Sequence, residues 1–216
     1  MSSPPPDDPT WLDGLPRLLD DRRRPGFRDV FGALASRSTA LDVALTHIRL
    51  STLDLSEAEL ARMQRIRLLL AEVSAVTLDA EAHAVLHHAV MAANLRRLAR
   101  LLHLGRIEVR SAPLGGWAPD FSIFRGDGGP FAALVGPHRF DRGTVHAGPV
   151  LASLHGAQDA ARSAARFAEV WGRAHDIRPA IAGILARAEQ GTPAPDGDVQ
   201  FAPPTGESLR DTRVFG

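Results

Sequence analysis

The chain contains no cysteine, no lysine and no tyrosine among its 216 residues. The missing cysteine excludes disulfides, thiolate metal sites and a cysteine nucleophile. The missing lysine excludes a Schiff base and the lysine of a phosphate-binding loop, and the missing tyrosine excludes a tyrosine nucleophile. All 25 basic residues are therefore arginine, so any cationic site in this protein must be built from guanidinium groups.

Net charge and long apolar runs are also lacking. The formal charge is zero and aromatic residues make up 6% of the chain, so no global field attracts nucleic acid or an anionic membrane. No stretch of eighteen apolar residues occurs, and no basic segment followed by an apolar run opens the sequence. We expect a cytoplasmic protein without membrane contact. Its single domain should span residues 10–189, between a disordered N-terminus (1–9) and a flexible tail (190–216).

The centre of the predicted fold is the segment Gly105–Gly136. Short apolar and β-branched runs bounded by Gly and Pro predict three strands, Ile107–Ser111, Asp120–Arg125 and Phe131–Val135. The last two are separated by Gly126–Gly129, a composition typical of a tight turn.

The segments on either side alternate between strand and helix patterns. A buried strand is predicted at Leu41–Leu50, and helical spacing of Leu60, Met63, Arg67 and Leu70 predicts a helix that begins at Ser56. The other predicted elements are helices Trp11–Asp21, Phe27–Ser36, Asp79–Leu104, Ala157–Ala174 and Pro179–Glu189, and strands Ala75–Leu78 and Pro149–Leu154. Successive strand–helix–strand units predict an α/β fold with a mixed, mostly parallel sheet and flanking helices.

This element order resembles one half of the phospholipase D-like superfamily, over roughly residues 38–177. In that family a strand pair carries the signature H-x-K-x4-D, in which the His attacks a phosphodiester and the Lys holds phosphate oxygens. Aligned through the FSIF and ALVG segments, these positions fall on Ala118, Asp120 and Arg125. None of the three matches.

The second signature of the family, G-S-x-N, is also degenerate. Gly136 is retained, but the Ser and Asn positions fall on Pro137 and Arg139. A phosphodiester site must gather positive charge around its transition state, and Asp120 places a negative charge where the family has lysine. The resemblance therefore implies a phospholipase D-like domain that has lost the family's catalysis.

A different catalytic site is an alternative. Asp120, His138 and His146 form a candidate acid–base set, with Ser153 and His155 nearby in the sequence. The competing interpretation is that these are loop histidines in water and an aspartate that begins a strand.

Residues at strand ends could bind a ligand beside that set. Ligands of open α/β sheets lie beyond the carboxyl ends of strands, where Arg49 and Ser51 are expected. Trp117, in a Gly/Pro loop, is a candidate anchor, and Ser153 is the fourth candidate ligand-binding residue. His83 and His87 stand four apart, but no third ligand has a matching spacing, so no metal and no cofactor are predicted.

Three functions remain open. The first is an inactive phospholipase D-like domain that serves as a binding or regulatory module for a protein or small molecule. Because two halves pair in that family, the resemblance also implies a homodimer of this chain. The second is a hydrolase that uses Asp120 with His138 or His146. The third is a weak nucleic-acid binder with an arginine patch of Arg96, Arg97, Arg100, Arg106 and Arg110. We expect no nucleic-acid binding, because five phosphate contacts give only modest, salt-sensitive affinity.

Overall fold

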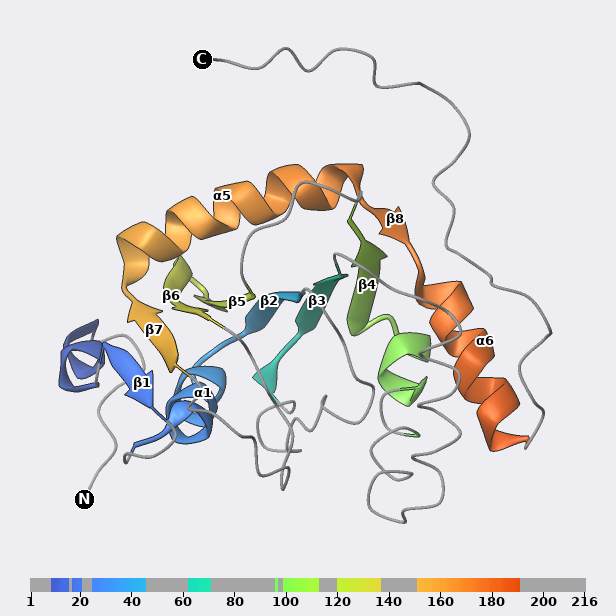
Figure 1. Cartoon of the computed structure of the whole chain (residues 1–216), viewed down its shortest axis with the longest axis horizontal. Coiled ribbons are helices and arrows are strands. Elements are labelled where there is room, and N and C mark those ends of the chain that lie inside the picture. Colours follow the sequence, from blue (N-terminus) through green and yellow to red (C-terminus); the bar gives the residue numbers. More distant parts are fainter. Residues whose placement is uncertain are drawn as a thin grey trace, which may run out of the picture.

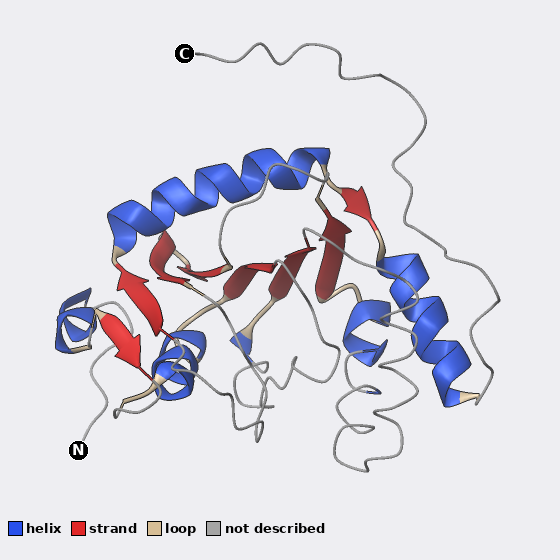
Figure 2. Ribbon diagram, in the orientation of Figure 1, coloured by secondary structure: helices blue, strands red, loops and turns tan. Residues whose placement is uncertain are grey.

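One open sheet of eight strands forms the body of the molecule (Figures 1 and 2). The structure is a computed structural model that describes residues 9–15, 17–20, 25–45, 62–70, 96, 99–112, 120–136 and 151–190. The strands are β1 (Leu18–Asp20), β2 (Ala40–Leu45), β3 (Arg65–Leu70), β4 (Ile107–Ser111), β5 (Phe121–Gly126), β6 (Gly129–Val135), β7 (Leu151–His155) and β8 (His175–Asp176). The helices are the 3-10 helix η1 (Pro9–Gly14) and the α-helices α1 (Phe27–Ala35), α5 (Ala157–Arg173) and α6 (Arg178–Glu189).

Strand direction changes within the sheet at β2. The spatial order is β1-β7-β6-β5-β2-β3-β4-β8. β2 pairs in parallel with β3, and β3 with β4, whereas β2 pairs antiparallel with β5. The remaining described pairings are also antiparallel. The predicted mixed α/β class is confirmed, but its parallel part is limited to β2, β3 and β4.

The β5–β6 hairpin accounts for much of the antiparallel half. Gly126 pairs with Gly129, so Asp127 and Gly128 form a two-residue turn. Gly129 has a φ of 109°, a conformation that a side chain would disfavour. The loop is shorter than the predicted Gly126–Gly129 turn, because Gly126 and Gly129 are the last paired residues of the two strands.

Helices cover both faces of the sheet (Figure 1). One apolar cluster joins α5 to one face through Phe121, Ile123, Phe167 and Trp171. A larger cluster joins α1 and α6 to the opposite face. Because side chains alternate along a strand, odd-numbered residues of β2 face α1 and even-numbered residues face α5.

Several predicted elements are confirmed with shifts of one or two residues at their ends. These are α1, β4, β5, β6, β7, α5 and α6. The predicted helix cap at Gly105 is confirmed as well. Gly105 has a φ of 68°, its N–H donates to the Leu102 carbonyl at 3.1 Å, and the Arg106 N–H donates to the Leu101 carbonyl at 3.0 Å. This pair of bonds is a Schellman motif.

Two predictions are wrong. The helix predicted from Ser56 is replaced at residues 65–70 by β3, in which Ile66, Leu68 and Leu70 face the α1 side and Leu69 faces α5. The apolar residues of this segment fit the helical period of 3.6 as well as the strand period of 2. Pairing with β2 and β4 selected the strand. The helix predicted at Trp11–Asp21 is replaced by η1 and β1, because Pro16 lacks the N–H of a helix interior and β7 offers a free edge.

Other predictions lie outside the described residues. They concern the end of the strand at 46–50, the strand at 75–78, the start of the helix at 56, most of the helix at 79–104, and both chain ends. Within the described part of the chain, no helix has the length and apolar character needed to cross a membrane.

Packing of α5 on the sheet can be tested by substitution. Phe167 is fully buried and Trp171 is 8% exposed, with their rings stacked at 5.4 Å between centroids. We expect Trp171→Ala to lower the free energy of unfolding by about 3–5 kcal/mol, because it leaves a cavity under the helix. The control Arg166→Ala, whose side chain is 56% exposed, should change it by less than about 0.5 kcal/mol. Equal denaturant midpoints for the two variants would show that α5 is peripheral.

Candidate functional site: a buried charge cluster at the centre of the sheet

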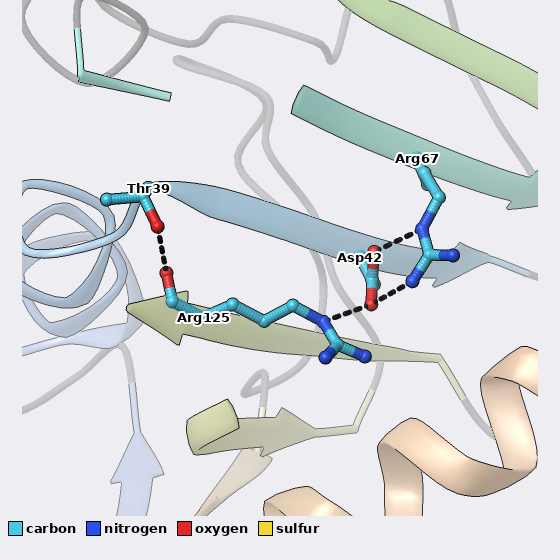
Figure 3. A network of polar contacts seen from close by, with 4 residues as sticks. All are labelled: Thr39, Asp42, Arg67 and Arg125. Atoms are coloured by element: carbon cyan, nitrogen blue, oxygen red, sulfur yellow. Dashed lines mark hydrogen bonds and ion pairs between the residues drawn. The ribbon is translucent and has the colours of Figure 1, made fainter. Parts of the chain in front are cut away.

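A fully buried aspartate lies in the middle strand of the sheet. Asp42 has no exposed surface. Arg67 binds its carboxylate with two hydrogen bonds, Nε to Oδ1 and Nη2 to Oδ2, both 2.6 Å. The Nε of Arg125 donates to Oδ2 at 2.6 Å (Figure 3). We call Asp42, Arg67 and Arg125 the Asp42 cluster.

Strand register brings the three side chains of the Asp42 cluster together. Asp42 is directly opposite Arg67 on β3 and opposite Ile123 on β5. Arg125 lies two residues beyond Ile123, so its side chain is on the same face and reaches back diagonally. Thr39, just before β2, fixes the same end of β5, because its N–H donates to the Arg125 carbonyl at 2.8 Å.

The helix α5 covers the cluster with aromatic rings. The Arg67 guanidinium carbon lies 4.9 Å from the Phe167 ring centroid and 5.3 Å from that of Trp171. Arg110 approaches Trp171 at 4.8 Å and donates from Nη1 to the Trp171 carbonyl at 2.8 Å. Cation–π contacts gain strength when the cation is desolvated, so the arginines of the sheet also hold α5 in place.

Charges alternate across the sheet on this face. Arg67 is opposite Asp42 on one side and opposite Glu108 of β4 on the other. Arg110 is opposite Asp176 of β8. A hydrogen bond from Arg178 holds the pKa of Asp176 below its ordinary value. Opposite charges on facing strands stabilise a sheet, so this row favours one strand order.

The Asp42 carboxylate is fully engaged within the Asp42 cluster. The Asp42 carboxylate accepts three charge-assisted hydrogen bonds, so proton transfer to it would break a buried ion pair. The Nε of Arg125 binds the Asp42 carboxylate. The described contacts of this carboxylate are ion pairs that join β2 to both of its neighbouring strands.

Two of the predicted site residues lie within the described part of the chain. Asp120 precedes β5, and its carbonyl accepts a hydrogen bond from the Gly136 N–H at 2.9 Å. Ser153 lies on β7, with β6 between it and β5. The predicted residues outside the described ranges are Arg49, Ser51, Trp117, His138 and His146.

The predicted arginine patch is only partly available at the surface. Arg96 and Arg100 are exposed. Arg106 donates to the Met63 carbonyl, and Arg110 contacts Trp171. Arg97 lies outside the described residues. The described arginines therefore present a smaller cationic surface than the sequence suggested.

Sequence reasoning missed the Asp42 cluster, although the signal for it was present. Asp42 lies within the apolar run LDVAL and Arg67 within RIRLLL, and a charge inside a buried strand must be paired. In the described ranges, no group of three His, Asp or Glu side chains is placed to hold a metal ion.

Comparison with known proteins finds similarity of fold. No protein-family model and no curated protein sequence matches the chain. The structure is similar to Nuc from Salmonella typhimurium, a phospholipase D family member, with 10% sequence identity and a TM-score of 0.47, over 74% of this chain and 95% of Nuc.

A second similar structure is TrmBL2, an archaeal chromatin protein that shows a novel mode of DNA binding. The identity is 11% and the TM-score 0.44, over 76% of this chain and 55% of TrmBL2. The chain therefore spans about half the length of that protein. The class defined by the structure itself is a mixed α/β domain with an open, helix-covered sheet.

The Asp42 cluster makes a stability prediction. Asp42→Ala would leave two guanidiniums, 13% and 21% exposed, without their anion, so we expect a loss of about 3–5 kcal/mol. Asp13→Ala is the control, since that side chain is 75% exposed in its ion pair with Arg17 and should cost less than about 1 kcal/mol. Urea denaturation measures both.

A triple substitution separates buried charge from lost packing. Replacing the whole cluster, with Asp42→Leu, Arg67→Met and Arg125→Met, should recover most of the stability lost in Asp42→Ala, because buried ion pairs can be exchanged for apolar residues of similar volume. A triple variant no more stable than Asp42→Ala would contradict this account.

Proposed function

We propose that the chain is a phospholipase D-like domain without phosphodiesterase activity that acts as a binding or regulatory module. The observation that carries this proposal is the pairing of Arg125 with Asp42. At the position where the phospholipase D-like family has a catalytic aspartate, this chain has an arginine whose Nε is used in a buried ion pair.

The charges at the other signature positions support the same conclusion. Asp120 occupies the lysine position, and the chain has no lysine at all. A phosphoryl transition state requires preorganised positive charge, and a carboxylate at that position opposes it. The binding role follows from the retained architecture, in which the sheet and its helices are well packed. The partner is proposed to be a protein or small molecule, with the chain in a homodimer.

The absence of phosphodiesterase activity can be tested with bis-p-nitrophenyl phosphate. We expect no turnover above buffer, because neither the nucleophile nor the lysine of the signature is present. A preparation with turnover should be repurified and compared with Asp120→Asn and with the control Asp127→Asn, which changes an exposed turn residue. Turnover that survives repurification and disappears only in Asp120→Asn would contradict the proposal.

Nucleic-acid binding is tested separately, because few arginines of the predicted patch are exposed in the described part of the chain. With Arg96 and Arg100 as the described exposed members of the patch, we expect no detectable binding at about 150 mM salt, where non-specific dissociation constants of dedicated binders are roughly 0.1 mM to 1 μM. Fluorescence anisotropy with a labelled duplex measures this. Sub-micromolar binding that is weakened by Arg96→Ala and Arg100→Ala, but not by Arg166→Ala, would favour a nucleic-acid-binding function instead.

A further inference from the structure

A serine, a histidine and an aspartate are arranged in series where β7 leads into α5. Ser153 and His155 are two residues apart on β7 and so share a face. The Ser153 Oγ lies 2.8 Å from the His155 Nε2. On the other side of the ring, the His155 Nδ1 lies 3.8 Å from Oδ2 of Asp159, in the first turn of α5.

The protons of this group can be assigned from its contacts. A neutral imidazole donates from one nitrogen and accepts at the other. The carboxylate beside Nδ1 favours the proton there, which leaves Nε2 free to accept from the Ser153 hydroxyl. The other acceptor near that hydroxyl is the Val135 carbonyl at 3.3 Å, a longer contact. The hydroxyl is within donating distance of both acceptors, and the contact with Nε2 is the shorter of the two.

We propose that Ser153, His155 and Asp159 form a hydrolytic triad that acts on small carboxylic esters. Ser153 is the nucleophile, His155 is the general base, and Asp159 is a positioning residue that holds the imidazole tautomer. This activity is independent of the proposed phospholipase D-like function, since β6 lies between β7, which carries Ser153 and His155, and β5, which carries Arg125 of the Asp42 cluster.

The position of the triad suits an external substrate. The His155 and Asp159 side chains are 36% and 53% exposed, so an ester can approach from solvent. Asp159 is held from its other oxygen by Arg162, with Nη1 at 3.2 Å from Oδ1. This second contact leaves Oδ2 directed to the histidine, as a positioning residue requires.

The start of α5 and the Arg17 side chain both lie near the junction of β7 and α5. α5 begins at Ala157 after Gly156, which provides no side-chain cap, so the first N–H groups of a 17-residue helix point toward this end. Arg17 lies close by, because a Cβ added to Gly156 would be 3.9 Å from its Nη1. The helix terminus favours negative charge there, whereas Arg17 already pairs with Asp13 at 3.0 Å.

The reaction balances without a cofactor. The Ser153 Oγ attacks the carbonyl carbon while its proton passes to the His155 Nε2. The ester C–O bond then breaks, and the imidazolium protonates the departing alkoxide to release the alcohol. Water attacks the acyl-serine, gives its proton to His155, and releases the acid as the proton returns to Ser153.

The test combines covalent labelling with ester turnover on the full chain. A fluorophosphonate probe should give a single adduct, located on Ser153 by peptide mass spectrometry. Hydrolysis of p-nitrophenyl acetate should fall about 100-fold or more in Ser153→Ala and in His155→Gln, the range of a lost general base. Asp159→Asn should lower kcat with little change in KM, which a purely structural role would not produce. Ser163→Ala, on α5, is the matched control and should behave as wild type.

Some results would overturn the triad. They are the absence of a Ser153 adduct, labelling that persists in Ser153→Ala, or ester turnover unchanged in His155→Gln. His155→Gln keeps this test decisive if Ser153→Ala fails to fold, because the His155 side chain is partly exposed and its loss should leave the denaturation midpoint unchanged.

Discussion

The sheet depends on one buried carboxylate. Asp42 lies in β2, the strand at which parallel pairing with β3 changes to antiparallel pairing with β5. Its carboxylate binds one arginine from each neighbour. A buried ion pair adds little net stability but penalises every arrangement that leaves a charge unpaired. The Asp42 cluster therefore selects which strands flank β2 and in which register.

The same arginines connect the sheet to its covering helix. Arg67 lies under Phe167 and Trp171, and Arg110 contacts the ring and the carbonyl of Trp171. α5 is thus held by apolar packing and by cation–π contacts at its C-terminal half. Its first turn carries Asp159, which lies beside Ser153 and His155 of β7. The helix α5 therefore contacts the Asp42 cluster with one half and the proposed triad with the other.

The two functional proposals use different parts of this architecture. The proposed absence of phosphodiesterase activity concerns β5, where Arg125 is paired with Asp42. The proposed triad concerns β7 and the start of α5. A carboxylic ester needs a nucleophile, a base and a site for a single developing negative charge. That requirement is smaller than the charge needed around a phosphoryl group, and the start of α5 lies close to the proposed triad.

Local sequence patterns were sufficient where the apolar residues fit only one secondary-structure period, or where a specific residue marks the end of a helix. The stripe of Ala160, Ala164, Phe167 and Trp171 predicted α5, and Gly105 predicted the helix end before β4. The lack of lysine is likewise a property of the sequence alone, and our expectation that the chain lacks phospholipase D-type catalysis depends on it. These inferences hold because backbone period, left-handed φ and side-chain chemistry are properties of the residues themselves.

Only the tertiary structure decided the elements and contacts that depend on distant neighbours. RIRLLL is a strand because β2 and β4 supply its hydrogen bonds, and Leu18–Asp20 is a strand because β7 presents an edge. Asp42 meets Arg125 across 83 positions of sequence, and Asp159 reaches His155 across a strand-to-helix turn. No local pattern encodes such meetings, because they arise from the register and order of strands, which the whole core selects together.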